Sequence, residues 1–297
     1  MWLLLACTTP APEPAPEDTG VPPTPEMLFR YVVIADPHVS DPAGDNLQRL
    51  DLAVSWVNTE AEGRDLELAL VLGDICWDDG VDVAHDSLDN LTIPWVPLNG
   101  DNEVHLGAEE AYSVAFADQY EALARTFDEW EEGPVRVDNP EWGVPSWFHN
   151  LAFTYKGVRF VGLDWASRDA DPILGEFGEL HDFEGGTFPF FEEQVARSSV
   201  GRTENVVLFS HIPMHLGSFD LDEMNRIAAV TAPLGEHVWA DLAGHYHGSA
   251  SETVEDAGYD LHVTDATWDD TIELRIVDVW VAGDAFAPTT ELVTVPM

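Results

Sequence analysis

Apolar runs alternate with polar loops through most of the chain. Three short runs rich in Val, Ile and Leu, each followed by Asp, Gly or Asn, predict buried strands: residues 29–35, 66–72 and 93–98. Between the first two runs, residues 47–62 place Leu50, Val54 and Val57 on one face, which predicts a helix. This strand–loop–helix order favours an α/β fold with its chemistry at the carboxyl ends of the strands.

The second half of the chain continues the pattern. Residues 153–155 and 158–164 flank Lys156-Gly157, a spacing typical of a β-hairpin. A helix is expected over residues 188–196, and strands over residues 205–209 and 238–242. Residues 261–295 alternate apolar and polar positions and predict further strands, in a second sheet.

Residues 109–147 break this rhythm, because they are acidic and rich in tryptophan. We expect an insertion over the site, spanning residues 105–150 and partly helical. Two interpretations stay open. The segment either covers a sheet edge as a plain surface subdomain or forms a lid over the substrate.

Acidic residues dominate the charge. The 297 residues include 56 Asp and Glu against 12 Lys and Arg, a formal net charge of −44. Such a surface repels phosphate backbones, so duplex nucleic acid is not expected as a partner, whereas divalent cations are attracted. An acidic surface that serves solubility alone explains the same charge. The hydrophobic share of 45% suits one large folded domain.

The chain opens with the apolar run Trp2 to Ala6, followed by Cys7. This start resembles a bacterial lipoprotein signal with its lipobox, over residues 1–7. The resemblance implies cleavage before Cys7 and a lipid anchor on its thiol, hence a periplasmic or surface-exposed protein of the cell envelope. The run is short and no Lys or Arg precedes it, so an apolar start without meaning is the alternative. Residues 8–26, rich in Pro and acidic residues, predict a disordered linker to a domain over residues 27–297.

Five short motifs carry the candidate chemistry, and each follows a predicted strand. They are Asp36-Pro37-His38, Gly73-Asp74, Gly100-Asp101-Asn102-Glu103, Ser210-His211 and Gly244-His245-Tyr246-His247. Carboxylates and imidazoles are the ligands of divalent transition metals. Each motif alone is weak evidence, since a lone histidine is more often structural. All five in this order, at strand ends, indicate a metal centre.

The order of these motifs resembles the calcineurin-like metallophosphoesterase family, whose pattern is D-x-H, G-D, G-N-H-[DE], a lone His and G-H-x-H. The resemblance implies a four-layer α-β-β-α sandwich with two mixed β-sheets. It also implies two divalent ions (Mn, Zn or Fe) and attack of a shared hydroxide on a phosphomonoester or phosphodiester. By the same resemblance, the first ion takes Asp36, His38 and His247, the second takes Asp101, His211 and His245, and Asp74 bridges them.

The third motif departs from the family pattern. Asn102 stands where the family has a histidine that protonates the leaving group, and an amide cannot supply a proton near pH 7. A shifted alignment would instead make Asn102 the ligand, and His105 could replace the missing acid or be a plain surface residue. We expect Asn102, Asp74 and His211 to be the catalytic residues. The alternative is a metal-binding surface scaffold that has lost turnover. Substrate and oligomeric state stay open.

Overall fold

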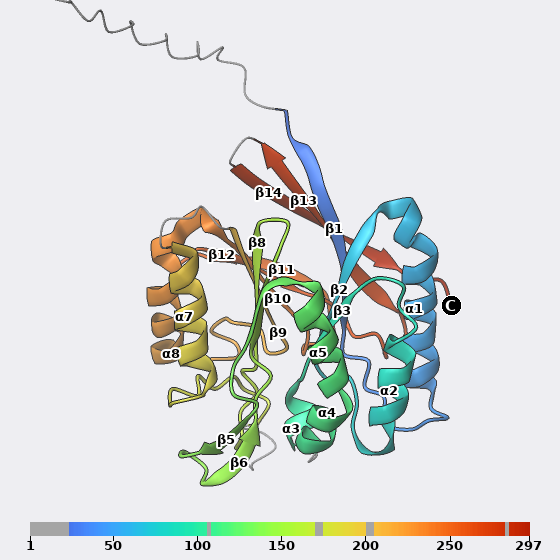
Figure 1. The fold of residues 1–297 in the computed structure, drawn as a ribbon, viewed down its shortest axis with the longest axis horizontal. Helices are drawn as coiled ribbons and strands as arrows, with labels where there is room; N and C mark the ends of the chain where they lie inside the picture. Colours follow the sequence, from blue (N-terminus) through green and yellow to red (C-terminus); the bar gives the residue numbers. More distant parts are fainter. Residues whose placement is uncertain (1–23, 106–107, 170–174, 200–204, 283–284) are drawn as a thin grey trace, which may run out of the picture.

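Two mixed β-sheets lie face to face between two layers of helices (Figure 1). The structure is a computed structural model that describes residues 24–105, 108–169, 175–199, 205–282 and 285–297. Aromatic side chains fill the space between the sheets, where the ring of Tyr31 meets that of Phe160 edge-on at 5.4 Å. This arrangement confirms the expected α-β-β-α sandwich.

The first sheet has five strands in the order β14-β13-β1-β2-β3. Its parallel strands are β1 (Glu26–Ala35), β2 (Leu66–Leu72) and β3 (Trp95–Leu98). Antiparallel to β1 runs β13 (Glu273–Ala282), followed by β14 (Ala285–Thr294). The expectation that the whole carboxyl-terminal tail joins the second sheet is therefore wrong for these two strands. Alternating apolar residues indicate that a segment forms a strand, but they do not indicate which sheet the strand joins.

The second sheet has seven strands in the order β11-β12-β10-β9-β8-β7-β4. Four neighbouring strands are parallel: β8 (Val158–Leu163), β9 (Asn205–Ser210), β10 (Val238–Ala243) and β12 (Tyr259–Val263). The antiparallel strands are β7 (Leu151–Tyr155), β4 (Asp128–Glu132) and β11 (Ala250–Val254). The predicted hairpin is confirmed, because β7 and β8 pair across Lys156 and Gly157, which both have positive φ.

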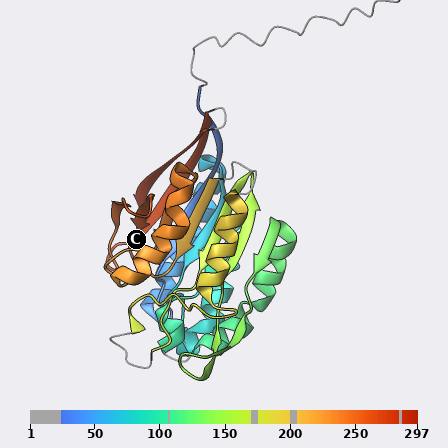
Figure 2. The same cartoon turned by 90° about the vertical axis from the view of Figure 1, so that its left-hand side faces the viewer.

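Helices cover the outer face of each sheet. On one side lie α1 (Asp45–Arg64) and α2 (Val81–Leu88), which follows the short 3-10 turn η1 (Asp78–Gly80). On the other lie α7 (Thr187–Ser199) and α8 (Leu221–Thr231), side by side in Figure 2, and α8 runs into η2 (Ala232–His237). A capping box between Asp220 and Glu223 starts α8.

The segment expected as an insertion over the site packs one face against the core and leaves most of its other residues exposed or half-buried. It contains α4 (Glu109–Ala115), α5 (Ala117–Thr126), β4, and the small hairpin of β5 (Arg136–Asn139) and β6 (Val144–Trp147). Tyr112, Phe116 and Leu123 are buried in the main core, and β4 pairs with β7 at the edge of the second sheet. Their apolar faces bury more favourably against the core than over a polar site.

Cys7, the predicted signal over residues 1–7 and most of the predicted linker lie outside the described residues. Within the part of the chain that the structure describes, no helix has the length and apolar character needed to cross a membrane.

Candidate metal centre

All seven predicted ligand residues meet at one edge of the two sheets. Loops after β1, β2, β9 and β10 carry six of them, and the seventh opens the short helix α3 (Asp101–His105) after β3. Parallel strands end at the same edge, so residues far apart in sequence converge there. The side chains form two groups of possible ligands: Asp36, His38, Asp74 and His247, and then Asp101, His211 and His245.

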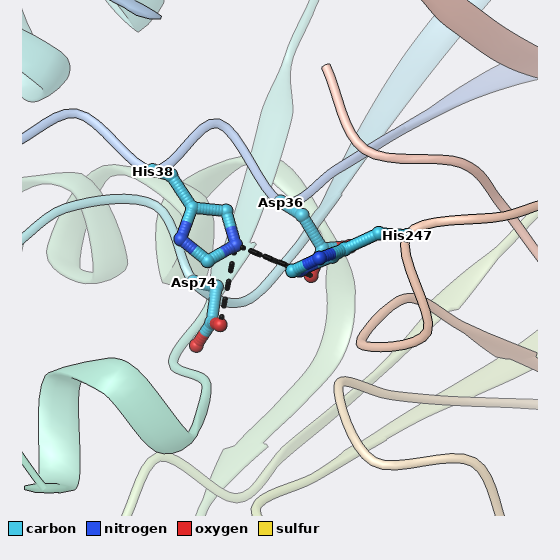
Figure 3. A group of neighbouring side chains, drawn as sticks. All are labelled: Asp36, His38, Asp74 and His247. Carbon is cyan, nitrogen blue, oxygen red and sulfur yellow. Dashed lines mark hydrogen bonds and ion pairs between the residues drawn. The ribbon is translucent and has the colours of Figure 1, made fainter. Parts of the chain in front are cut away.

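The side chains of the first group point toward one another (Figure 3). The Nε2 atoms of His38 and His247 lie 3.0 Å apart. Asp36 Oδ1 is 3.8 Å from His38 Nε2 and 3.6 Å from His247 Nε2. Asp36 and His38 are buried, whereas the His247 side chain is 36% exposed. Two facing imidazole nitrogens beside a carboxylate suit a bound cation.

The second group is more tightly connected. Asp101 Oδ1 lies 2.8 Å from His211 Nε2 and 3.0 Å from His245 Nδ1. His211 Nδ1 donates to the carbonyl oxygen of Leu72 at 2.9 Å, which leaves Nε2 free to act as a ligand. All three donor atoms lie within 4.8 Å of one another.

Asp74 lies between the two groups. Its Oδ2 is 3.5 Å from His38 Nε2, and its Oδ1 is 3.3 Å from His211 Nε2. The backbone N–H of Asn102 donates to Oδ1 at 2.9 Å and holds the carboxylate in place. One oxygen faces each group, which is the arrangement a bridging ligand needs.

Five of the seven ligand residues have a left-handed backbone conformation. Among the described non-glycine residues with positive φ are Asp36, His38, Asp74, His245 and His247. Left-handed backbone costs on the order of 1–3 kcal/mol per such residue and persists where packing enforces it. At these five positions the loops turn sharply after the strands that carry them, and together they make up half of the ten described non-glycine residues with positive φ.

Among the described residues, the side chain of Asn102 hydrogen-bonds to His38 of the first group. Its Nδ2 lies 3.0 Å from His38 Nδ1. A half-turn of the amide presents Oδ1 instead, which accepts the Nδ1 proton and leaves the lone pair of Nε2 for a metal. Asn102 thus sits where it can orient a ligand. The side chain of His105, considered above as a substitute acid, lies outside the described residues.

Two structural supports escaped the sequence interpretation. Glu103 is fully buried and accepts the N–H groups of Cys76 and Gly100, at 2.8 and 2.6 Å, so it ties the second motif to the third. Burial and the charge of Asp74 raise the pKa of Glu103 to about 8. In the sequence, the position of Glu103 as the last residue of the third motif was the feature that could have indicated this supporting role.

The second support is a buried network behind the third motif. Asn99 Nδ2 donates to Asp164 Oδ2 at 2.9 Å, and Arg168 pairs with both oxygens of Asp164 at 2.8 Å. Asp164 directly follows a strand, as the other motif aspartates do, and this position could have drawn attention to it. The network anchors the loop that presents Asp101.

Electrostatics favour cations at this edge. The pKa of His211 is raised well above its ordinary value; burial opposes the proton, but Asp74 and Asp36 outweigh it. The pKa of His38 is also raised, by Asp36 and Asp74 against the effect of burial. His211 and His245 hold the pKa of the Asp101 carboxyl far below its usual range despite burial. Positive charge is therefore stabilised among these carboxylates, as proton or as metal ion.

The donor set fits two divalent ions. Four imidazoles and three carboxylates stand in two groups around a shared aspartate, a mixture that suits Mn, Zn or Fe better than Ca or Mg. The fold, with two mixed sheets between helical layers, is consistent with the calcineurin-like sandwich.

Comparison with known proteins supports the fold alone. No protein-family model matches the chain, and no curated protein does. Among solved structures, the sulfate thiohydrolase SoxB of Thermus thermophilus aligns with a TM-score of 0.52 at 14% identity, over 92% of this chain and 57% of that one. GAP50, the anchor in the inner membrane complex of Plasmodium, aligns at 0.46 and 9% identity, over 92% and 90% of the two chains. Vacuolar protein sorting 29 of Cryptosporidium parvum aligns at 0.36 and 9%, over 91% and 100%.

Proposed function

We propose that this protein hydrolyses phosphate esters, mono- or diesters, with two divalent ions held at the sheet edge. The observation that carries the proposal is the position of Asp74, with one oxygen 3.5 Å from His38 Nε2 and the other 3.3 Å from His211 Nε2. Two adjacent ions, when bound, lower the pKa of water and offset negative charge that develops on a phosphoryl group.

Different residues of the chain would bind each ion and orient its ligands. Asp36, His38 and His247 would hold one ion, and Asp101, His211 and His245 the other. Leu72 fixes the tautomer of His211, and Asn102 orients His38. His247 is the most exposed ligand of the first group, so the substrate would approach from its side.

Asn102 also sets the substrate preference that we propose. No imidazole stands at this position to protonate a leaving alkoxide, so the site would favour esters whose leaving group departs as an anion. Aryl phosphates meet this condition and alkyl phosphates do not.

The test is release of p-nitrophenol from p-nitrophenyl phosphate and bis(p-nitrophenyl) phosphate with Mn²⁺. We expect metal-dependent turnover on at least one ester, and its loss in Asp74→Ala. Asp89→Ala, a change at an exposed aspartate on another helix end, is the matched control and should retain turnover. Turnover that survives Asp74→Ala would refute the proposed site.

The second candidate is a metal-binding scaffold without turnover. It is favoured by one observation, the amide of Asn102 in the place of an acid beside His38. Tight binding of two ions by the wild-type chain, with no hydrolysis of either ester, would establish this alternative.

We further propose a lipid anchor at Cys7, on the bacterial cell envelope, which rests on the apolar run before that cysteine. Intact-mass measurement of the protein from a bacterial membrane fraction tests it. A terminus that starts at Cys7 with added acyl mass is expected; an uncut, unmodified terminus would refute it.

A further inference from the structure

A third group of ligand-type side chains lies away from the two groups at the sheet edge. Glu141, Glu179 and His181 offer two carboxylates and one imidazole, with donor atoms within 4.8 Å of one another. Glu141 lies in the turn of the β5–β6 hairpin, and the other two precede α7. The five motifs do not include any of them.

His181 is the informative member of this group. Its side chain is fully buried, and its Nε2 lies 3.0 Å from the carbonyl oxygen of Ala166, to which it donates. A neutral imidazole that donates from Nε2 carries its lone pair on Nδ1. That Nδ1 has no hydrogen-bond partner among the described residues, and its nearest ionic neighbour is Glu179 Oε1 at 3.8 Å. A buried lone pair without a partner is costly, and a metal ion would satisfy it.

The two carboxylates are placed to complete a site. Glu179 accepts from the Ser167 hydroxyl at 2.9 Å and the backbone N–H of Arg168 at 3.1 Å, which fixes its direction. The turn that carries Glu141 is held by Asn139, whose side chain accepts the N–H of Glu141 at 2.9 Å. Glu141 itself is exposed, so the third donor stands at the solvent side, where an ion can enter.

From this geometry we propose a third cation site at Glu141, Glu179 and His181, separate from the proposed binuclear centre. One imidazole with two carboxylates suits a divalent transition metal, and Zn²⁺ is the appropriate probe. An ion there would fasten the β5–β6 hairpin to the loop before α7. It would also steady Arg168, whose pair with Asp164 supports Asn99.

The experiment is equilibrium dialysis of the full chain against Zn²⁺, with elemental analysis of the bound metal. Glu141→Gln removes one carboxylate at an exposed position and keeps an amide that can still hydrogen-bond to Glu179, whereas Glu179→Gln would disturb the bonds to Ser167 and Arg168. Glu184→Gln makes the same charge change at an exposed residue nearby and is the matched control.

We expect Glu141→Gln to lose one ion relative to wild type, or to bind it at least ~10-fold more weakly, while Glu184→Gln matches wild type. The same difference should persist when both are made in Asp74→Ala, so the result does not depend on the binuclear centre or on hydrolysis. Equal ion counts and affinities in wild type and Glu141→Gln would overturn the proposal.

Discussion

The two groups of ligands at the sheet edge differ in how closely their ligand atoms contact one another. In the second group, one oxygen of Asp101 contacts both imidazoles, at 2.8 and 3.0 Å. In the first group, the nearest carboxylate oxygens stay 3.5 Å or more from the facing nitrogens of His38 and His247. The second group therefore holds its shape through its own hydrogen bonds, whereas the first needs a shared proton or a cation.

Exposure separates single residues rather than the two groups. The side chain of His247 in the first group is 36% exposed and that of His245 in the second is 13% exposed, whereas Asp36 and His211 are buried. His247 therefore marks the side of the site that meets solvent.

The largest effect should come from removing the carboxylate that joins the second group. Asp101→Ala leaves the buried imidazole of His211 and the half-buried one of His245 without their common partner, so turnover should fall by on the order of 10²–10³. His247→Ala, at the exposed side of the first group, lets water take the vacated position, and we expect a loss nearer tenfold. Rates on p-nitrophenyl phosphate, with metal content measured in parallel, check both. Equal losses would break the distinction between the groups.

A somewhat smaller change is expected from Asn102→His, which touches the first group through His38. An imidazole supplies the missing proton, so hydrolysis of an alkyl phosphate should rise by roughly 10²-fold, with the aryl ester little changed. Asn102→Ala is the companion variant: it should lower metal affinity about tenfold without any gain on alkyl esters. An equal rise on both esters would argue against a general-acid explanation.

The pH dependence of metal binding probes both groups together. Because the pKa values of His211 and His38 are raised, these imidazoles keep their protons to higher pH in the metal-free protein than a free imidazole does. A metal ion needs the neutral ring, so binding should release protons, and Mn²⁺ affinity should rise about tenfold per pH unit for each proton released. Calorimetry in two buffers of different ionisation enthalpy measures this release. His237→Gln, at a histidine outside the groups, should behave as wild type; absence of proton release would contradict the assignment.

The same shifts affect stability with a definite sign. A histidine whose pKa is higher in the folded state stabilises that state below the unfolded pKa, near 6.5, and loses this contribution as pH rises through the folded value. The metal-free protein should therefore lose stability on the alkaline side of neutrality, and bound metal should remove that loss.

The last and smallest expected effect concerns stability and is expected at Asp241, beneath the second group. This buried carboxylate accepts the Ser210 hydroxyl at 3.1 Å and the Met214 N–H at 2.9 Å, on either side of His211. Burial raises its pKa to about 7, so its stabilising proton is present below pH 4 and is lost as pH rises through 7. Relative to Asp241→Asn, wild type should lose roughly 2–4 kcal/mol of unfolding free energy between pH 4 and 8. Denaturant unfolding at several pH values measures it, and parallel curves would contradict the buried-acid explanation.

The sequence predicted best those features that depend on residues close together in the chain. The bounds of β2 and the Lys156-Gly157 hairpin follow from apolar runs and turn residues, and the convergence of the ligand residues follows from strands that end at one edge. The pairing of strands far apart in the chain could not be predicted in this way. One example is β13, which pairs with β1, more than two hundred residues earlier in the chain. Nor could the pattern show that Arg168 is buried against Asp164, or that His181 turns an unpaired nitrogen toward two glutamates, because single polar residues carry no periodicity.

Two glycines limit how this scaffold can be changed. A Cβ atom at Gly100 would lie 2.3 Å from Asp74 Oδ1, and one at Gly244 would lie 2.3 Å from Asp36 Oδ2. Even alanine at either position would push a ligand carboxylate out of place. Engineering for a new substrate should therefore leave Gly100 and Gly244 unchanged.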